Sequence, residues 1–387
     1  MANWEYVRIG DVCTVERGGS PRPIDKFITD DPNGINWIKI GDTDDSMYIT
    51  KTAQKIIPEG MKKSRYVQPG DFLLSNSMSF GRPYILKIDG CIHDGWLVLR
   101  DNNGIFDKRF LYYYLSSPST YQKFKNMAVG GVVNNLNSEM VRGVTVPVPT
   151  MDEQLNVVSV LDKVTELIAL RKEQLAKLDQ LVKSRFIELL QPYFDKGETQ
   201  PLINFVCDTR PITYGILKPG TDCEGGYPVI RVKDFSRGLV SEKEVLHTTP
   251  EIYNKYLRSV LEEGDIILSI GGTIGRIAII PKEFAGANIT QHTARIALKD
   301  KRYLFYFRGL LESDMMQRWM KERVLGVAQP SINLGDVKQI PIPIVDECVI
   351  KELNTFVEQT DKSKLAIQQS LDKLELLKKS LMQEYFG

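Results

Sequence analysis

The stretch from Asp152 to Leu190 constrains the fold most, because nothing in it interrupts a helix. It contains no glycine and no proline, and its apolar residues recur at alternating spacings of three and four. That spacing is typical of a coiled-coil seam, and at 1.5 Å per residue the stretch predicts a helix of roughly 55 to 60 Å. A helix with so narrow an apolar stripe needs a partner, and we expect Asp346–Phe386 to provide it. The residues expected to pack the two helices together are Leu161, Val164, Ile168, Leu175, Leu178, Val182, Leu371, Leu374 and Leu377.

The chain contains two copies of one unit, offset by about 194 residues. In the clearest match, Tyr66–Pro83 and Val260–Ile277 both carry Gly-Asp, an apolar segment, a loop of small polar residues and Gly-Arg. A second match relates Leu136–Gln154 to Ile332–Cys348. Each copy is therefore expected to be a globular domain followed by one long helix. The expected domains are residues 1–150 and 197–345, and the expected helices are residues 151–196 and 346–387.

Each domain is predicted to begin with short strands separated by turns and to continue with a helical stretch. The helical stretches are Asp107–Met127 and Lys301–Arg323. A segment with alternating proline follows, which is confined to a sheet edge or a connector, and Asp152 and Asp346 are expected to cap the long helices. The fold class is thus expected to be α+β, with two similar domains separated by two long helices in an antiparallel coiled coil. The predicted strands are Trp37–Ile40, Asp71–Leu74, Tyr84–Lys87, Leu97–Leu99, Val229–Val232, Asp265–Ser269, Arg276–Ile280 and Ala294–Leu298.

Composition excludes several classes of protein. The net charge of +1 gives no strong sign of a polyanion partner, and the five cysteines have no metal-ligand spacing. We expect no signal peptide, because Met1 leads straight into polar sequence, and no apolar run approaches the roughly 20 residues of a membrane helix. We therefore expect a cytoplasmic protein without membrane association. Cys13 and Cys207 align in the two copies and are expected to be small buried residues.

The sequence contains few candidates for catalysis. A phosphate-binding GxxxxGK[ST] loop is absent, and none of the three histidines has a neighbour at metal-ligand spacing. We expect no catalytic residue, no metal and no cofactor. One alternative is a nuclease centre at Asp336–Lys338, although this pair is expected to open a strand and is more simply explained as a solvated surface pair.

Four polar, glycine-rich loops recur at matching places in the two domains. Glycine lets a backbone approach closely, arginine and lysine bond guanine or phosphate, and asparagine and glutamine bond adenine. Any single loop could be a simple turn. However, the frame repeats while the loop side chains differ, which favours two readers of different sequences. The paired loops are Glu16–Asp25 and Thr209–Gly220, Ser75–Arg82 and Ser269–Arg276, Cys91–Trp96 and Ile289–Ala294, and Ala128–Asn137 and Leu325–Leu334.

The candidate DNA-contacting residues come from these loops and from the strand ends beside them. For His93 and His292 a structural hydrogen bond is the alternative to DNA contact, and for Arg82 and Arg276 it is a structural salt bridge. The candidates in the first domain are Ser20, Arg22, Lys39, Asn76, Ser77, Ser79, Arg82, His93, Asn134 and Asn135. The candidates in the second domain are Tyr214, Lys218, Arg231, Lys233, Thr273, Arg276, Gln291, His292, Gln329 and Ser331.

Over its whole length the chain resembles the specificity subunit of a type I restriction-modification enzyme. The segments that carry the resemblance are Val146–Gln154, Ile340–Cys348, Gln68–Ser75, Glu262–Ser269 and Ile212–Gly220. One departure is Cys348, which stands where the family usually has glutamine after Asp-Glu, and we expect it to change only the local capping.

The resemblance implies two target recognition domains that each read half of an interrupted, asymmetric site in double-stranded DNA. It also implies a helical spacer that sets their separation and docks two methyltransferase subunits. Two restriction and translocase subunits would join in the full complex, and catalysis would belong to these partners. A structural adaptor built on the coiled coil, with no role in DNA binding, is the alternative.

Overall fold

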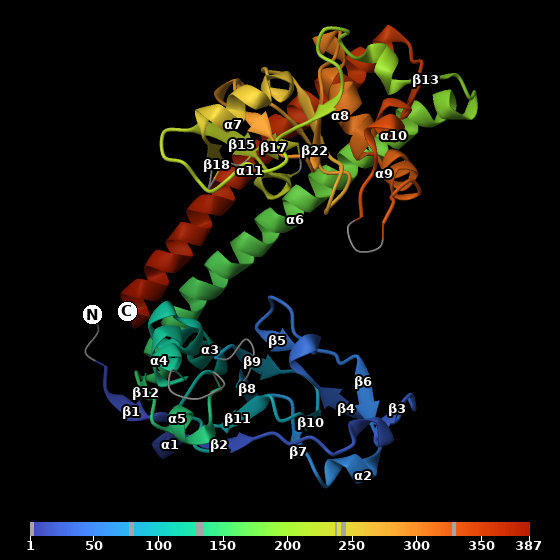
Figure 1. The fold of residues 1–387 in the computed structure, drawn as a ribbon. Coiled ribbons are helices and arrows are strands. Elements are labelled where there is room, and N and C mark those ends of the chain that lie inside the picture. The colour runs from blue at the N-terminus through green and yellow to red at the C-terminus, as the bar shows by residue number, and fades with distance from the viewer. Residues whose placement is uncertain (1–3, 77–80, 129–134, 237, 241–244, 327–329) are drawn as a thin grey trace. The chain divides into compact units, whose positions relative to one another are not determined.

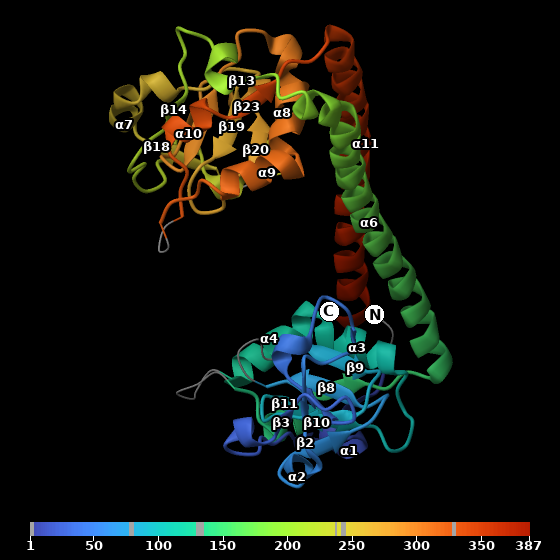
Figure 2. The same ribbon diagram turned by 90° about the vertical axis from the view of Figure 1, so that its right-hand side faces the viewer.

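The computed structural model describes residues 4–76, 81–128, 135–236, 238–240, 245–326 and 330–387. It divides into two compact units, of which the first comprises Met1–Leu170 with Ser370–Gly387 and the second comprises Arg171–Gln369. Each unit therefore holds one globular domain together with part of each long helix (Figures 1 and 2).

The first domain consists of two sheets and a layer of helices. Strand β8 is buried throughout because it lies in the middle layer: Phe72 and Leu74 pack toward the helices, and Leu73 packs toward the other sheet. One sheet has the order β2 (Thr14–Arg17), β11 (Trp96–Arg100), β8 (Phe72–Ser75), β9 (Pro83–Leu86), β5 (Tyr48–Ile49). The other has the order β3 (Ile28–Thr29), β6 (Gln54–Ile56), β4 (Ile35–Ile38), β10 (Gly90–Ile92), β7 (Arg65–Val67).

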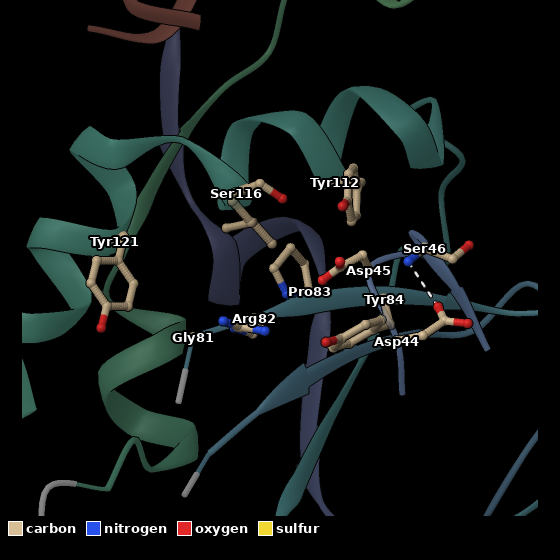
Figure 3. Close-up of a pocket in the computed structure, with 11 residues that line it drawn as sticks. Asp44, Asp45, Ser46, Gly81, Arg82, Pro83, Tyr84, Tyr112, Ser116 and Tyr121 are labelled. Carbon is tan, nitrogen blue, oxygen red and sulfur yellow. Dashed lines mark hydrogen bonds between the residues drawn. The ribbon is translucent and has the colours of Figure 1, made fainter. Parts of the chain in front are cut away.

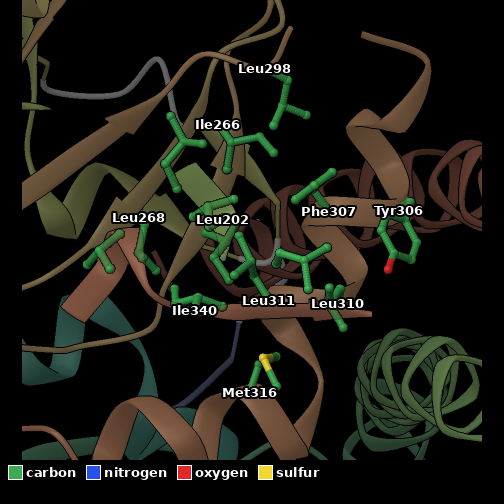
Figure 4. Close-up of a cluster of buried hydrophobic side chains, with 14 of the residues drawn as sticks. Leu202, Ile266, Leu268, Leu298, Tyr306, Phe307, Leu310, Leu311, Met316 and Ile340 are labelled. Carbon is green, nitrogen blue, oxygen red and sulfur yellow. The ribbon is translucent and has the colours of Figure 1, made fainter. Parts of the chain in front are cut away.

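The second domain repeats this layering. Ile266 and Leu268 pack on the helix layer with Phe307 and Leu310 (Figure 4), while Ile267 packs into the core on the other face of the sheet. The predicted strands are confirmed to within two residues. The sheets have the orders β14 (Thr213–Tyr214), β22 (Thr293–Ile296), β19 (Ile266–Ser269), β20 (Ile277–Ile279); β18 (Leu246–Thr248), β15 (Tyr227–Ile230), β21 (Asn288–Ile289); and β16 (Phe235–Ser236), β17 (Leu239–Val240).

Each predicted helical stretch is two helices. Ser117 adopts an extended conformation before Pro118, and Ser313 is extended and caps the following helix through Met316 N. These serines separate α3 (Lys108–Ser116) from α4 (Pro118–Ala128), and α8 (Leu304–Glu312) from α9 (Asp314–Lys321). The short helices are α1 (Ile9–Val12), α2 (Pro58–Met61), α5 (Ser138–Arg142), α7 (Pro250–Lys255), α10 (Leu334–Lys338), η1 (Ile24–Lys26), η2 (Ile40–Asp42), η3 (Leu202–Phe205), η4 (Val232–Asp234), η5 (Leu257–Ser259), η6 (Lys282–Phe284) and η7 (Lys301–Tyr303).

The segments with alternating proline lie in two-stranded sheets, as an edge strand requires. β12 (Thr145–Pro147) pairs antiparallel with β1 (Tyr6–Arg8), and β23 (Pro341–Pro343) pairs antiparallel with β13 (Thr199–Pro201). β12 and β23 each lead into the long helix that follows in the chain.

The long helices are α6 (Met151–Asp195) and α11 (Glu347–Phe386). The expectation that Asp152 caps α6 is wrong, because Thr150 and Glu153 form the capping pair. In the second unit Asp179 pairs with Lys364 and Arg185 pairs with Glu352. The helices therefore run antiparallel there, since the higher-numbered residue of α6 meets the lower-numbered residue of α11.

In the first unit Met382 and Phe386, near the end of α11, belong to the same buried cluster as Val157 and Leu161, near the start of α6, which agrees with antiparallel helices. One expected seam residue, Leu377, is 46% exposed. The next residue, Lys378, is half-buried and turns toward the first domain, where its Nζ lies 5.8 Å from the centre of the Tyr113 ring. Of the other expected seam residues, Leu161, Val164, Ile168, Leu175, Val182 and Leu371 are buried, and Leu178 and Leu374 are half-buried.

Candidate nucleic-acid interface

The loops of the second domain surround a cavity of about 930 Å³. Leu217 and Pro219, on either side of Lys218, line it from the first loop. The other lining residues come from η4 and from the second, third and fourth loops. The structure thus brings together predicted residues that are far apart in sequence: Arg231, Lys233, Thr273, Arg276, Gln291, His292 and Ser331.

Arg231 follows the end of β15, and its side chain is oriented by the buried carboxylate of Asp234 in η4. Its Nε donates to Asp234 Oδ2 at 2.8 Å, its Nη2 donates to Oδ1 at 3.1 Å, and its backbone N–H donates to Oδ2 at 2.9 Å. The Asp234 residue is only 4% exposed. A planar guanidinium held along two bonds keeps a defined direction, whereas lysine could not take the same fork.

Arg276 connects the second loop to η4. Its Nη1 donates to the carbonyl of Val232 at 3.1 Å, and its backbone N–H donates to Ser269 Oγ at 2.8 Å. Ser269 Oγ in turn donates to the carbonyl of Thr273 at 2.6 Å. The loop therefore holds Thr273 and Arg276 at the cavity through its own hydrogen bonds.

Glycine lets the loops meet closely at this cavity. A Cβ on Gly271 would lie 2.4 Å from His292 Nδ1, so a side chain there would displace the histidine. Gln291 N donates to the carbonyl of Ile216 at 2.9 Å, and Gly272 N donates to that of Pro330 at 3.2 Å. Ile270 N donates to the carbonyl of His292 at 2.8 Å, so all four loops are joined through their backbones.

Two predicted residues of the second domain, Tyr214 and Lys218, are not among the residues that line the cavity. Tyr214, on β14, is 42% exposed and carries the guanidinium of Arg258 5.4 Å from its ring centre. It does not line the cavity. Gln329 lies outside the described residues.

In the first domain three of the predicted residues, Ser20, Arg22 and Asn76, meet at Asp94, which sequence reasoning missed. Ser20 Oγ donates to Asp94 Oδ1 at 2.7 Å, and Arg22 Nη2 lies 3.6 Å from Oδ2. Asn76 Nδ2 and Arg17 Nε both donate to the Asp94 carbonyl, at 2.9 and 3.1 Å. The hydrogen bond from Ser20 lowers the pKa of Asp94 despite some burial, so this carboxyl is ionised. Its place next to His93 in a recurring loop was the available signal.

His93 has the structural environment that was the alternative to DNA contact. The backbone N–H of Gly95 points at Nδ1 at 2.7 Å, and that of Ile40 points at Nε2 at 3.1 Å. Burial lowers the pKa of the imidazole, which keeps it neutral and able to accept one of these bonds. Asn76 is also internal, with only 2% of its surface exposed, so it holds the loop together beneath the surface.

The remaining first-domain candidates are dispersed. Lys39 Nζ donates to Gln54 Oε1 at 2.7 Å, and Asn135 is exposed. Ser77, Ser79 and Asn134 lie outside the described residues.

Arg82 lines a separate cavity of about 480 Å³ beneath α3 and α4 (Figure 3). Tyr84, Tyr112, Asp44 and Asp45 line the same cavity. The structure therefore does not bring Arg82 together with Ser20 and Arg22.

The structure does not place the pair Asp336–Lys338, the alternative nuclease centre, at the start of a strand as expected. Asp336 lies in helix α10 and not at the start of a strand, because Asn333 caps that helix by accepting from Asp336 N at 2.8 Å. The Asp336 carboxylate also accepts from the Asn333 side-chain amide. Over the described ranges, no group of three or more His, Cys, Asp or Glu residues could hold a metal ion. No helix in the described part of the chain is long and apolar enough to cross a membrane.

Comparison with known proteins points to one family. The family model described as type I restriction modification DNA specificity domain matches residues 1–180 and 218–381. The specificity subunit of the type I restriction enzyme EcoBI from Escherichia coli is 24% identical over 361 residues, covering 85% of this chain and 75% of that subunit. The MjaVIII specificity subunit from Methanocaldococcus jannaschii is 24% identical over 404 residues, covering 96% of this chain and 91% of that subunit.

Solved structures show the same fold. A chain from a type I R-M system superposes with a TM-score of 0.57 at 19% identity, covering 100% of this chain and 98% of that chain. The crystal structure of a type I system S subunit from M. genitalium gives a TM-score of 0.55 at 15% identity, covering 100% of this chain and 96% of that chain.

Proposed function

The chain belongs to the type I restriction-modification DNA specificity family, and from that premise we propose that it reads an interrupted, asymmetric site in double-stranded DNA. Each domain reads one half of the site. The observation that carries this proposal is the cavity of the second domain, where side chains from η4 and from all four loops converge.

The chemistry of that cavity suits base edges and phosphates. Among its described lining residues Arg231, Lys233 and Arg276 are cationic, and none is acidic. Arg231 is held on Asp234 in a defined direction, as a bidentate contact to guanine needs. Gln291 and Thr273 add adaptable hydrogen-bonding groups. A loop surface of this kind distinguishes bases by about 1 to 3 kcal/mol per good contact.

The long helices carry an apolar surface beyond the one they bury. Exposed large apolar side chains that gather on a surface mark a protein interface. We assign this surface to the docking of two methyltransferase subunits, with the helices also setting the spacing of the half-sites. The exposed large apolar residues of the helices are Met151, Leu155, Val160, Leu167, Leu170, Leu181, Ile187, Leu365, Leu376 and Leu377.

The proposed partners supply the chemistry. Methylation belongs to the methyltransferase subunits, and ATP hydrolysis and cleavage belong to two restriction subunits in the full complex, so this chain is a non-catalytic cytoplasmic subunit. The exposed leucines would equally serve a structural adaptor, which has no need of the basic cavity in the second domain.

Methylome sequencing separates these functions. Cells that express this chain with its cognate methyltransferase subunit should carry methylation at one interrupted motif. Arg276→Ala should relax one half of that motif, while Lys282→Ala, an exposed residue of the same domain outside the cavity, should leave it unchanged. Methylation without a motif, or a motif that Arg276→Ala does not alter, would favour the adaptor.

A further inference from the structure

Asp94 is an acidic side chain placed where three loops of the first domain meet. Ser20 and Arg22 approach it from the first loop, and Asn76 approaches it from the second. About 42% of the Asp94 side chain remains exposed. A carboxylate therefore reaches the surface beside Ser20 and Arg22, two of the residues expected to meet DNA.

The carboxylate is held in place while it keeps accepting capacity. Its Oδ1 takes the Ser20 hydroxyl at 2.7 Å, and the backbone N–H of Asp94 donates back to Ser20 Oγ at 3.3 Å. Its Oδ2 has Arg22 at 3.6 Å, which is an ion-pair distance and longer than a hydrogen bond, and the Arg22 side chain is 83% exposed. An ionised carboxylate has about four lone-pair sites, so Ser20 leaves several of them open to a further donor.

A negative charge on a surface for a polyanion is unfavourable unless it meets a donor. Phosphate oxygens only accept hydrogen bonds and repel a carboxylate. In the major groove the donors are the N4 amino group of cytosine and the N6 amino group of adenine. A carboxylate at this place is therefore suited to a base amino group and unsuited to the DNA backbone.

We propose that Asp94 accepts a hydrogen bond from the amino group of a cytosine or an adenine, so that the first domain selects A or C against G or T at one position of one strand. This inference rests on the proposed function. Ser20 positions the carboxylate. The positive charge of Arg22 beside it reduces the repulsion between the Asp94 carboxylate and the DNA phosphates.

The second domain has no such group at the matching place. Ile92 pairs with Ile38 as Ile289 pairs with Ile230, so Asp94 corresponds to Gln291, whose neutral amide lines the cavity of the second domain. The two domains therefore present different chemistry at one point of a shared frame. An acid in one half and none in the other is what an asymmetric site requires.

The inference is tested by removing either partner of the proposed hydrogen bond, the amino group of the base or the carboxylate of Asp94. The full chain, bound to its cognate methyltransferase subunit, is titrated with duplexes of its motif that each lack one amino group in the first half-site. Purine replaces adenine, 2-pyrimidinone replaces cytosine, and the base that is methylated stays intact. For the unaltered chain one replacement should weaken binding about tenfold or more. In Asp94→Ala the same replacement should have almost no effect, because the acceptor is already gone.

Two further variants separate reading from positioning. Asp94→Asn keeps the shape and an acceptor for Ser20. With this variant the methyltransferase subunits should methylate sites with additional bases at that one position, while the second half-site stays the same. Ser20→Ala keeps the carboxylate, so it should bind more weakly with an unchanged base preference. Asp30→Asn, an equal change of charge at an exposed site of the same domain, should behave as the unaltered chain.

The outcomes are distinguishable from failure of the proposed function. If the unaltered chain directs methylation to no motif, the function itself is wrong. If it has a motif but every amino deletion weakens Asp94→Ala as much as the unaltered chain, or Asp94→Asn keeps the full motif, Asp94 does not read a base.

Discussion

Gln154 and Asn354 perform one task from different positions on their helices. The Gln154 side chain accepts from Asp107 N at 2.8 Å and donates to the carbonyl of Ile105 at 2.9 Å. The Asn354 side chain accepts from Tyr306 N at 3.1 Å and donates to the carbonyl of Arg302. Each amide thus ties the start of a helix in the domain to the long helix that follows it.

This relationship explains how the second copy tolerates its departure from the family pattern. Cys348 stands where the first copy has Gln154, yet it is exposed, whereas Gln154 is completely buried. The amide function has moved along α11 to Asn354. The expectation that Cys348 changes only the local capping therefore understated the difference.

Removing Gln154 should accordingly be costly. In Gln154→Ala the buried N–H of Asp107 and the carbonyls of Ile105 and Pro149 lose their partner. We expect a loss of about 2 to 3 kcal/mol in the free energy of unfolding, measured by urea denaturation. Cys348→Ala is the matched control and should change it by less than about 0.5 kcal/mol. Equal effects of the two variants would contradict the shared role of the amides.

Cys13 should make stability depend on alkaline pH. Burial raises the pKa of its thiol from the ordinary 9.0 to about 12. Between these values the folded chain keeps a proton that the unfolded chain releases, so stability present below pH 9 is lost as the pH rises. The unfolding free energy should fall relative to Cys13→Ala by about 1.4 kcal/mol for each pH unit in this window. The same slope in the unaltered chain and in Cys13→Ala would contradict the prediction.

Arg231→Lys should test whether the fork on Asp234 matters. Lysine keeps the positive charge but cannot make the paired bonds to both oxygens of Asp234. We expect the motif to relax at a guanine position in the second half-site, with about 1 to 3 kcal/mol less discrimination, while the first half-site stays unchanged. Binding to duplexes with one altered base pair measures this. A uniform loss at every position would instead indicate a phosphate contact.

The proposed docking surface predicts how replacing exposed leucines on the long helices should affect binding of the methyltransferase subunit. Leu170 and Leu376 are 46% and 69% exposed, so Leu170→Glu and Leu376→Glu should leave the unfolding midpoint nearly unchanged. They should weaken capture of the methyltransferase subunit, measured by calorimetry. Leu161→Ala, at a fully buried position, should instead lower stability by about 2 to 5 kcal/mol. Full binding by both glutamate variants would remove the assignment of this surface.

Much of the fold follows from local patterns, whereas the site depends on long-range pairing. The strands, the long helices and the proline-containing edges could be predicted because apolar spacing and proline chemistry act locally. The inward position of His93 could not, because it depends on the parallel pairing of β10 with β4, which brings Ile40 to the ring. Asp94 could not be singled out from the sequence, because basic and amide side chains are the ones expected on a surface for DNA.

The last prediction concerns the proposed role of α6 and α11 as a spacer between the half-sites. If the helices set the distance between half-sites, inserting one helical turn, four residues and about 6 Å, at matched points of α6 and α11 should lengthen the gap in the methylated motif. Both half-sites should keep their bases, because every described loop that lines the second cavity lies outside the helices. Matched insertion preserves the antiparallel seam, while insertion in α6 alone shifts its register and should reduce stability. Methylome sequencing gives the gap and the half-sites together. A changed half-site with an unchanged gap would show that the helices act on recognition and not on spacing.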